Sequence, residues 1–333
     1  QINNSNNDIL NFDNLSYAAN IKNLTSIEKS KHYTFFKGSI CDINSIEKSF
    51  KNFKPNVIIH FAAESHVDRS INDPFKFLNT NIIGTTNLLK VSLDYYKSLE
   101  KEFKQKFKFL HISTDEVFGS LGIKGYFDED SPFLPNSPYS ASKASSNHMV
   151  RAWNHTYGLP TLITNCSNNY GPYQFPEKLI PLIIANCVDE KSLPIYGDGL
   201  NIRDWLFVDD HCKAIEKVLF EGSLGETYNI GCNNEINNIE IVKTICKIMD
   251  KLKPRKGSKK YSSLIKFVED RPGHDFRYGI NNSKIKKKLG WEPIESFDSG
   301  IKKTIRWYLD NEDWWREIQN KTYKQERLGL INE

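Results

Sequence analysis

The sequence lacks any long apolar run, and its cysteines are scattered. A membrane span needs roughly 20 apolar residues, and no stretch of the chain approaches that length. No Cys-x-x-Cys or other compact spacing joins the six cysteines, which are Cys41, Cys166, Cys187, Cys212, Cys232 and Cys246. Such a pattern argues against a disulfide framework and against a cysteine metal site. We therefore expect a cytoplasmic protein with reduced thiols, no metal and no membrane partner.

The sequence also has little net charge. Its 45 basic and 41 acidic residues leave a formal charge of +4 over 333 residues. The Lys-rich stretches at 253–260 and 284–288 contain no aromatic residues of the kind that stack on nucleobases, so we interpret them as solvated surface and expect no nucleic-acid partner. The length and the hydrophobic content of 39% fit a globular chain with a sizeable core, organised as two lobes.

A glycine-rich loop is missing before the first predicted strand. Ile9, Leu10 and Phe12 lead to Asp13, an acidic strand end of the kind that binds a ribose. In a dinucleotide fold, a Gly-x-Gly-x-x-Gly loop precedes such an acid by about 20 residues. Here 12 residues precede Asp13, none of them glycine, and the chain begins without methionine. We expect an incomplete sequence, with a chain that is not a working enzyme alone as the alternative.

The segment 113–119, Ser-Thr-Asp-Glu-Val-Phe-Gly, is the stretch around which the predicted function is organised. It follows the apolar run Phe107 to Ile112, which predicts a short buried strand. Thr114, Asp115 and Glu116 would then lie at the carboxyl end of that strand, where open α/β sheets bind their ligands. If the strand has ended, two adjacent carboxylates beside a hydroxyl can supply an acid and a base.

A second segment, Pro-Tyr-Ser-Ala-Ser-Lys at 138–143, has the features of a helix start. On a helix, Tyr139 and Lys143 share one face. A phenol has a pKa near 10, and a base that works near neutrality needs that value lowered by about 3 units. The Lys143 ammonium one turn away can supply part of this shift.

Together these segments carry a resemblance. Tyr-x-x-x-Lys after a Thr-Asp-Glu strand end resembles the extended short-chain dehydrogenase/reductase superfamily, and within it segment 113–119 resembles the dTDP-glucose 4,6-dehydratase family. The similarity runs from Asn11 to about Trp307 and includes motifs at 62–70, 138–146, 167–172 and 270–275.

The resemblance implies an α/β fold with a doubly wound parallel sheet, a smaller C-terminal α/β substrate lobe, and the family's first strand and helix missing. It implies an NAD-binding domain over 1–170, to which 199–230 returns, and a mainly nucleotide-sugar-binding domain over 171–333. The family's partners would be a nucleotide sugar and a second copy of the chain.

The reaction that the family implies is dehydration of dTDP-glucose at carbons 5 and 6. Tyr139 would take the 4-hydroxyl proton while carbon 4 is oxidised by NAD, with Lys143 holding Tyr139 anionic. Glu116 would remove the carbon 5 proton, Asp115 would protonate the departing 6-hydroxyl, and Thr114 would steady the carbonyl oxygen. This role requires the pKa of Asp115 to rise through burial and through Glu116.

The resemblance also assigns binding residues. Those for the cofactor are Asp13, Asn14, Leu15, Ser16, Ser39, Ile40, Phe61, Ala62, Ala63, Ser65, Thr80, Tyr139, Lys143 and Asn169. Those for the substrate are Ser65, Thr114, Asn168, Lys178, Leu179, Pro194, Tyr196, Arg203, Asn238, Arg271 and His274. Family members commonly carry an acid at the place of Ser39. Arg203 and Arg271 are the best phosphate ligands because a guanidinium binds phosphate through a planar fork.

Other segments give structural expectations. Apolar residues at helical spacing predict one long amphipathic helix over 75–99, which in this superfamily joins the Tyr139 helix in a dimer. Val57 to Phe61 predicts a strand buried on both faces. In Asp209-Asp210-His211 we favour a helix N-cap over a metal site.

Two alternatives stay open. A related UDP-sugar dehydratase, epimerase or decarboxylase would use the same Tyr139 and Lys143, although an epimerase needs no acid such as Asp115. A truncated, non-catalytic relative could bind a nucleotide sugar or a partner subunit.

Overall fold

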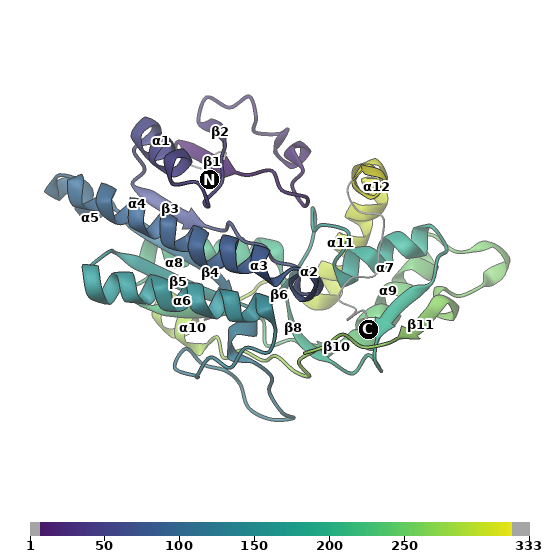
Figure 1. The fold of residues 1–333 in the computed structure, drawn as a ribbon. Helices are drawn as coiled ribbons and strands as arrows, with labels where there is room; N and C mark the ends of the chain where they lie inside the picture. Colours follow the sequence, from purple (N-terminus) through teal and green to yellow (C-terminus); the bar gives the residue numbers. More distant parts are fainter. Residues whose placement is uncertain (1–6, 322–333) are drawn as a thin grey trace.

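The computed structural model describes residues 7–321, which form two lobes (Figure 1). Residues 1–6 and 322–333, the ends of the two predicted domains, lie outside the described part. The strands of the larger lobe are β1 (Ile9–Asp13), β2 (Tyr33–Lys37), β3 (Val57–His60), β4 (Lys108–Thr114), β5 (Thr161–Cys166) and β9 (Thr227–Ile230). Its helical segments are η1 (Ile21–Leu24), α1 (Ile43–Phe53), α2 (Val67–Asn72), α3 (Pro74–Phe77), η2 (Leu78–Gly84), α4 (Thr85–Ser98), α5 (Lys101–Lys106), η3 (Asp115–Phe118), α6 (Pro138–Tyr157), α8 (Val208–Glu221) and α10 (Ser283–Leu289).

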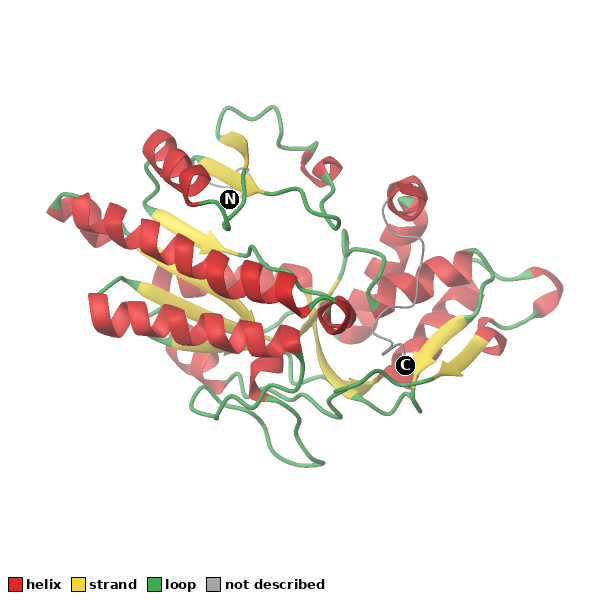
Figure 2. Ribbon diagram, in the orientation of Figure 1, coloured by secondary structure: helices red, strands yellow, loops and turns green. Residues whose placement is uncertain are grey.

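The smaller lobe and the region that joins it to the larger one contain the remaining elements (Figure 2). They are β6 (Asn168–Tyr170), α7 (Leu179–Val188), β7 (Leu193–Tyr196), β8 (Ile202–Phe207), β10 (Glu235–Asn237), α9 (Asn238–Leu252), η4 (Lys256–Ser258), η5 (Tyr261–Leu264), β11 (Ile265–Val268), α11 (Phe297–Asp310) and α12 (Glu312–Lys321). β7 pairs with β11, and β8 lies between β6 and β10.

A parallel sheet with the strand order β3-β4-β5-β9 forms the centre of the larger lobe. Neighbouring residues of β4 point to opposite faces: Phe109 packs in a cluster with α4 and α6, and Leu110 packs in a cluster with α8 and α10. Both side chains are fully buried, and burying one such side chain contributes roughly 2 kcal/mol. Helices cover both faces of a parallel sheet, so the predicted α/β class is confirmed.

β1 and β2 form a separate parallel pair. Among the described residues no strand joins this pair to β3, and Figure 1 shows the pair set apart from β3. The prediction of a fully buried strand over 57–61 is therefore wrong for part of the segment. Ile59 is 38% exposed and Phe61 is 59% exposed, because β3 has a strand neighbour, β4, on one side alone.

The single helix predicted over 75–99 is also corrected. The backbone is helical from α3 to α4, but Leu78–Gly84 is π-helical. A π-helical turn contains more residues than an α-helical turn, so it rotates the positions that follow it. The residues before this turn are therefore out of phase with α4. Phe75 and Leu78 face outward, at 78% and 40% exposed, while Leu88 and Leu89 are buried as predicted.

The core of the smaller lobe is formed by α7, α9, α11 and α12 around β7. At its junction with the larger lobe, α8 begins without the predicted aspartate cap, since the residue at the N-cap position is Phe207. Asp210 lies in the first turn instead, and its carboxylate accepts the backbone N–H groups of Ile294 and Glu295 at 2.9 and 2.7 Å. The acidic side chain therefore anchors the segment before α11.

Candidate active site

The carboxyl end of β4 presents the predicted acid and base. β4 ends at Thr114 and η3 begins at Asp115, so both carboxylates lie beyond the strand. Thr114 stabilises this transition because its hydroxyl accepts the backbone N–H of Glu116 at 3.3 Å. The same hydroxyl donates to Asp115 Oδ1 at 3.3 Å. The strand end and the short helix thus place the buried hydroxyl and acid next to the partly buried base.

Neither carboxyl group of this pair has an ion-pair partner among the described contacts. Burial raises the pKa of Asp115 well above its usual range, and the nearby carboxylates of Glu116 and Asp204 raise it further. Burial also raises the pKa of Glu116, against the opposing charges of Arg271, Arg203 and Lys178. The direction for Asp115 is the one that a general acid needs near neutrality.

Tyr139 and Lys143 lie on the buried face of α6. The helix begins as predicted, with Pro138 in its first turn and the Ser137 hydroxyl accepting from Ser140 N–H, and it ends at Gly158. The Lys143 ammonium donates to the carbonyl oxygen of Ile112 in β4 at 2.8 Å. This contact ties the helix to the strand that carries the acid pair.

The pKa of Tyr139 departs from expectation. Burial, Glu116 and Cys166 raise it well above 10, although a hydrogen bond with Thr114 opposes this. Burial also lowers the pKa of Lys143 to about 8, so the lysine carries less charge than an exposed one. The lowered phenol pKa expected from the Tyr-x-x-x-Lys spacing is therefore absent from the described protein.

Buried polar atoms without hydrogen-bond partners lie just after β5. Asn169 donates through Nδ2 to Cys166 Sγ at 3.4 Å and to Ser167 O at 3.2 Å. Asn168 Oδ1 and Asn169 Oδ1 are buried with no hydrogen-bond partner in the described structure. Buried polar atoms are usually paired, so unpaired ones at the end of a strand indicate a place for a polar ligand.

Most of the residues predicted to bind the cofactor lie at the carboxyl ends of β1, β2 and β3 or just beyond them. Asp13 ends β1, and its carboxylate accepts the Leu15 N–H at 2.6 Å. After β2, the Ser39 hydroxyl accepts the Cys41 N–H at 3.2 Å, and Ile40 is buried. After β3 come Phe61, Ala62, Ala63 and Ser65, and Thr80 lies within η2.

The residues predicted for the substrate form two groups. In one, Arg271 Nη1 donates to Asp68 Oδ1 at 2.9 Å, and Tyr196 Oη donates to Asp68 Oδ2 at 2.9 Å. The His274 ring lies edge-on to the Tyr196 ring, and a hydrogen bond of 2.6 Å joins His274 Nδ1 to Asp270 Oδ1. Arg271 Nε is buried without a partner in the described structure, so this guanidinium keeps a donor for a ligand.

The other residues predicted to bind the substrate make contacts within the protein or lie in secondary structure. Both Nη atoms of Arg203 donate to backbone carbonyls, those of Ile202, Phe276 and Asp275. These bonds occupy much of the planar fork expected for phosphate. Lys178 Nζ reaches across to the carbonyl oxygen of Ser65 at 3.1 Å. The remaining residues are fixed by secondary structure: Leu179 begins α7, Pro194 lies in β7 and Asn238 begins α9.

Sequence reasoning missed several residues that shape this region. Asp68 anchors Arg271 and Tyr196, and Glu177 accepts hydrogen bonds from Tyr17 and Arg69. Asp204 is fully buried and accepts the backbone N–H groups of Cys232 and Asn234. Asp68 lies inside the motif at 62–70, which was the one available signal. Nothing in the local sequence distinguishes Glu177 from an exposed carboxylate.

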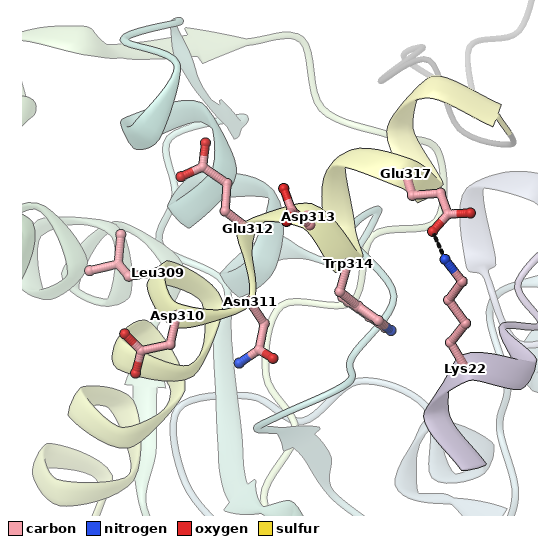
Figure 3. A pocket seen from close by; sticks show the side chains of 8 residues that line it. All are labelled: Lys22, Leu309, Asp310, Asn311, Glu312, Asp313, Trp314 and Glu317. Atoms are coloured by element: carbon pink, nitrogen blue, oxygen red, sulfur yellow. Dashed lines mark hydrogen bonds and ion pairs between the residues drawn. The ribbon is translucent and has the colours of Figure 1, made fainter. Parts of the chain in front are cut away.

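A hollow elsewhere on the molecule contains none of the predicted site residues. It lies between η1 and the α11–α12 region (Figure 3) and is lined by Lys22, Leu309, Asp310, Asn311, Glu312, Asp313, Trp314 and Glu317. Within residues 7–321, no three His, Cys, Asp or Glu side chains converge as metal ligands. None of the helices in that range combines the length and apolar character that crossing a membrane requires.

Comparison with known proteins agrees with the geometry. Residues 3–304 match the family described as GDP-mannose 4,6 dehydratase. The chain is 53% identical over 331 residues to dTDP-glucose 4,6-dehydratase of Neisseria meningitidis serogroup B, covering 98% of this chain and 93% of the relative. The NAD complex of the Bacillus anthracis dTDP-glucose 4,6-dehydratase matches with a TM-score of 0.82 and 46% identity, over 93% of this chain and 91% of that one. A Streptomyces venezuelae dTDP-glucose 4,6-dehydratase with NAD bound matches with a TM-score of 0.86 and 41% identity, over 95% and 91% of the two chains.

Proposed function

Because the chain belongs to the family of dTDP-glucose 4,6-dehydratases, we propose that it is a hydro-lyase that converts dTDP-glucose to dTDP-4-keto-6-deoxyglucose with NAD as its cofactor. The reaction is a step of deoxysugar biosynthesis. The observation that carries the proposal is the buried Asp115 carboxyl, adjacent to the partly buried Glu116 and near Tyr139. An epimerase needs no acid to expel a hydroxyl, so the raised pKa of Asp115 favours dehydration over that alternative.

Residues 1–170, with 199–230, are proposed to bind NAD, and 171–333 to bind mainly the nucleotide sugar. The ribose of the adenosine would meet Asp13, Asn14, Leu15 and Ser16, with Ser39 and Ile40 at the adenine. Phe61, Ala62, Ala63, Ser65, Thr80, Tyr139, Lys143 and Asn169 would surround the rest of the cofactor. The unpaired Asn169 Oδ1 supports a polar ligand at the nicotinamide end. We assign no residues to the pyrophosphate, because no Gly-x-Gly-x-x-Gly segment occurs in the sequence.

The nucleotide sugar is proposed to lie between Asn168 and Arg271. The free Nε donor of Arg271 makes it the stronger phosphate ligand, and Arg203 supports the same surface through the backbone at 275–276. The further contacts proposed are Ser65, Thr114, Lys178, Leu179, Pro194, Tyr196, Asn238 and His274.

In the proposed mechanism, Tyr139 removes the proton of the sugar 4-hydroxyl. When bound, NAD accepts the hydride from carbon 4 and returns it to carbon 6 after water has left. Thr114 donates a hydrogen bond to the new carbonyl oxygen, which acidifies carbon 5. Glu116 takes the carbon 5 proton, and Asp115, kept protonated by burial, gives its proton to the departing 6-hydroxyl, which leaves as water. Glu116 returns a proton to carbon 5 as hydride adds to carbon 6. The proton that Tyr139 took balances, by exchange with solvent, the one that Asp115 gave.

Lys143 is proposed to hold the nicotinamide ribose and to favour the Tyr139 anion. In the described protein the pKa of Tyr139 is raised, so Lys143 alone does not activate it. Positive charge brought by the bound cofactor would supply the remaining stabilisation, because an opposite charge close to a phenolate lowers its pKa.

We also propose that the protein works as a homodimer in the cytoplasm. The α4 and α6 helices lie side by side on one face of the sheet (Figure 1). The η2 segment that precedes α4 leaves Ile83 at 52% exposed, next to the exposed Phe75 and Leu78. Sedimentation of wild type and Ile83→Asp would test this, since a dimer built on these helices should dissociate in the variant.

The experiment that tests the reaction is mass spectrometry of the sugar nucleotide after incubation with dTDP-glucose and NAD. We expect loss of one water. UDP-glucose in a parallel reaction tests the related dehydratase, and an unchanged mass in both reactions would favour the non-catalytic alternative.

A further inference from the structure

Residues 14–24, which we call the strap, cross from the carboxyl end of β1 to the smaller lobe. The strap leaves β1 through a tight turn, in which Asp13 accepts the Leu15 N–H and Leu15 has a φ of 53°. It ends in η1, which Asn20 caps by accepting the Lys22 N–H at 3.1 Å. Figure 1 shows η1 facing α12 of the smaller lobe. The strap is thus a bridge between the two lobes.

A single buried carboxylate holds the middle of the strap. Tyr17 Oη donates to Glu177 Oε1 at 2.7 Å, and Arg69 Nε of α2 donates to Glu177 Oε2 at 3.2 Å. The Arg69 guanidinium carbon lies 3.8 Å from the centre of the Tyr17 ring. We call these three residues the clasp. The Glu177 side chain is 2% exposed and that of Arg69 is 29% exposed, so solvent screens the clasp less than it screens an exposed ion pair.

Two neighbouring groups favour the clasp without adding charge to it. The Tyr17 ring packs edge-on against Phe175, with ring centres 5.7 Å apart. Burial lowers the pKa of His66 to about 3, so the imidazole 3.9 Å from Glu177 is neutral. Burial and the Glu177 carboxylate raise the pKa of Tyr17 well above its usual range, which keeps its hydroxyl a donor.

The outer end of the strap is held more loosely. Lys22 pairs with Glu317 (Figure 3), but the two side chains are 58% and 30% exposed. Exposed pairs contribute little, because water and salt screen them. Trp314 Nε1 also donates to Asn23 Oδ1 at 2.8 Å. The clasp is therefore the contact whose loss should free the strap.

We propose that the clasp holds the strap closed over the adenosine half of NAD and slows release of the cofactor. Tyr17 and Glu177 are positioning residues in this device, which rests on the proposed NAD site. The reaction gives a reason for it, since hydride that leaves carbon 4 must return to carbon 6 of the same sugar. A cofactor that escaped midway would strand an oxidised intermediate.

The test compares Tyr17→Phe with Lys22→Ala. Tyr17→Phe keeps the ring and removes the hydroxyl through which the strap donates to Glu177, whereas Lys22→Ala removes the exposed contact of the same strap. Hydrogen exchange of backbone amides 14–24 in the ligand-free protein measures the strap directly. A stopped-flow chase measures the NAD dissociation rate. We expect Tyr17→Phe to increase the rates of amide exchange and of NAD dissociation about tenfold, which is the effect of losing a hydrogen bond to a charged group. Turnover of the variant should recover at high NAD concentration.

Glu177→Gln is the second variant. It replaces the carboxylate that accepts from Tyr17 and Arg69 with a neutral amide, so it should also speed NAD dissociation. The effects of Glu177→Gln and Tyr17→Phe should not add in the double variant, because both changes act on the Tyr17–Glu177 contact. Exchange and dissociation within twofold of wild type in Tyr17→Phe, or an equal change in Lys22→Ala, would overturn the proposal. Strap exchange needs no cofactor or turnover, so this failure is distinct from failure of the wild type to release water from dTDP-glucose.

Discussion

Two sets of buried carboxylates lie close together in this protein and differ in their partners. Asp115 and Glu116 have no ion-pair partner among the described contacts, and burial raises both pKa values. Asp68 is buried as well, and burial pushes its pKa upward, but the charge of Arg271 and the hydrogen bonds from Arg271 and Tyr196 outweigh this and hold the pKa below its usual value. Glu177 has Arg69 and Tyr17. Burial without a paired cation therefore favours the protonated form of Asp115, and burial beside Arg271 favours the anionic form of Asp68.

The largest expected effect comes from removing the unpaired acid. Asp115→Asn should slow water loss about 10²–10⁴-fold, the range for a lost general acid. Oxidation at carbon 4 should suffer much less, since Asp115 acts after it. NADH absorbance reports oxidation, and mass spectrometry reports water loss. Equal damage to both steps would contradict the role assigned to Asp115.

Glu116→Gln should be nearly as damaging, at about 10²-fold or more, because the carbon 5 proton loses its base. In deuterium oxide the wild type should place deuterium at carbon 5 of the product or recovered substrate, and the variant should not. Deuterium incorporation at the wild-type rate in Glu116→Gln would assign the base elsewhere.

Changes to the carboxylates that have ion-pair partners should lower the stability of the fold. Asp68→Asn leaves the Arg271 guanidinium buried without its carboxylate, which should lower the free energy of unfolding by about 3–5 kcal/mol. Chemical denaturation measures this. The matched control is Asp94→Asn in the exposed Lys90–Asp94 pair, where the aspartate side chain is 61% exposed. We expect no measurable change in the control, and a similar result in both variants would remove the contrast between the two sets.

The smallest effect is a difference in the sign of pH dependence. Asp115 has a raised pKa in the folded state. Its contribution to the free energy of unfolding is therefore present below the pKa of the unfolded chain, about 3.9, and is lost as pH rises through the pKa of the folded state. Asp68 has a lowered folded pKa, so its contribution is present above about 3.9 and is lost as pH falls through the folded value.

Unfolding curves at several pH values from about 5 to 8 test this pair of signs. Asp115→Asn should gain stability relative to wild type as pH rises, while the deficit of Asp68→Asn should stay constant. Parallel curves for wild type and Asp115→Asn would show that Asp115 is not held protonated.

Local sequence predicted the central elements well. The strands predicted over 9–13 and 107–112 and the helix start predicted at Pro138 lie close to where apolar runs and end signals placed them. Each has a local cause, such as Pro138 at a helix start or Gly158 at its end. The acid pair was also predictable, because a strand end fixes where the next residues lie.

Predictions that depended on neighbours were less successful. Phe75 and Leu78 have helical spacing but face outward, because the π-helical η2 rotates the face. Ile59 and Phe61 are partly exposed because β3 lacks a second strand neighbour among residues 7–321. No local pattern encodes either condition.

The sequence by itself determined the order of strands and helices, the buried acid pair and the family, since these rest on short segments. Tertiary structure decided which buried groups carry charge. Arg271 meets Asp68 across 203 residues, and Tyr17 meets Glu177 across 160. Tyr139 has a raised pKa because folding buries it and places Glu116 and Cys166 of other elements near it. A pKa depends on burial and on charges nearby in space, and folding sets both.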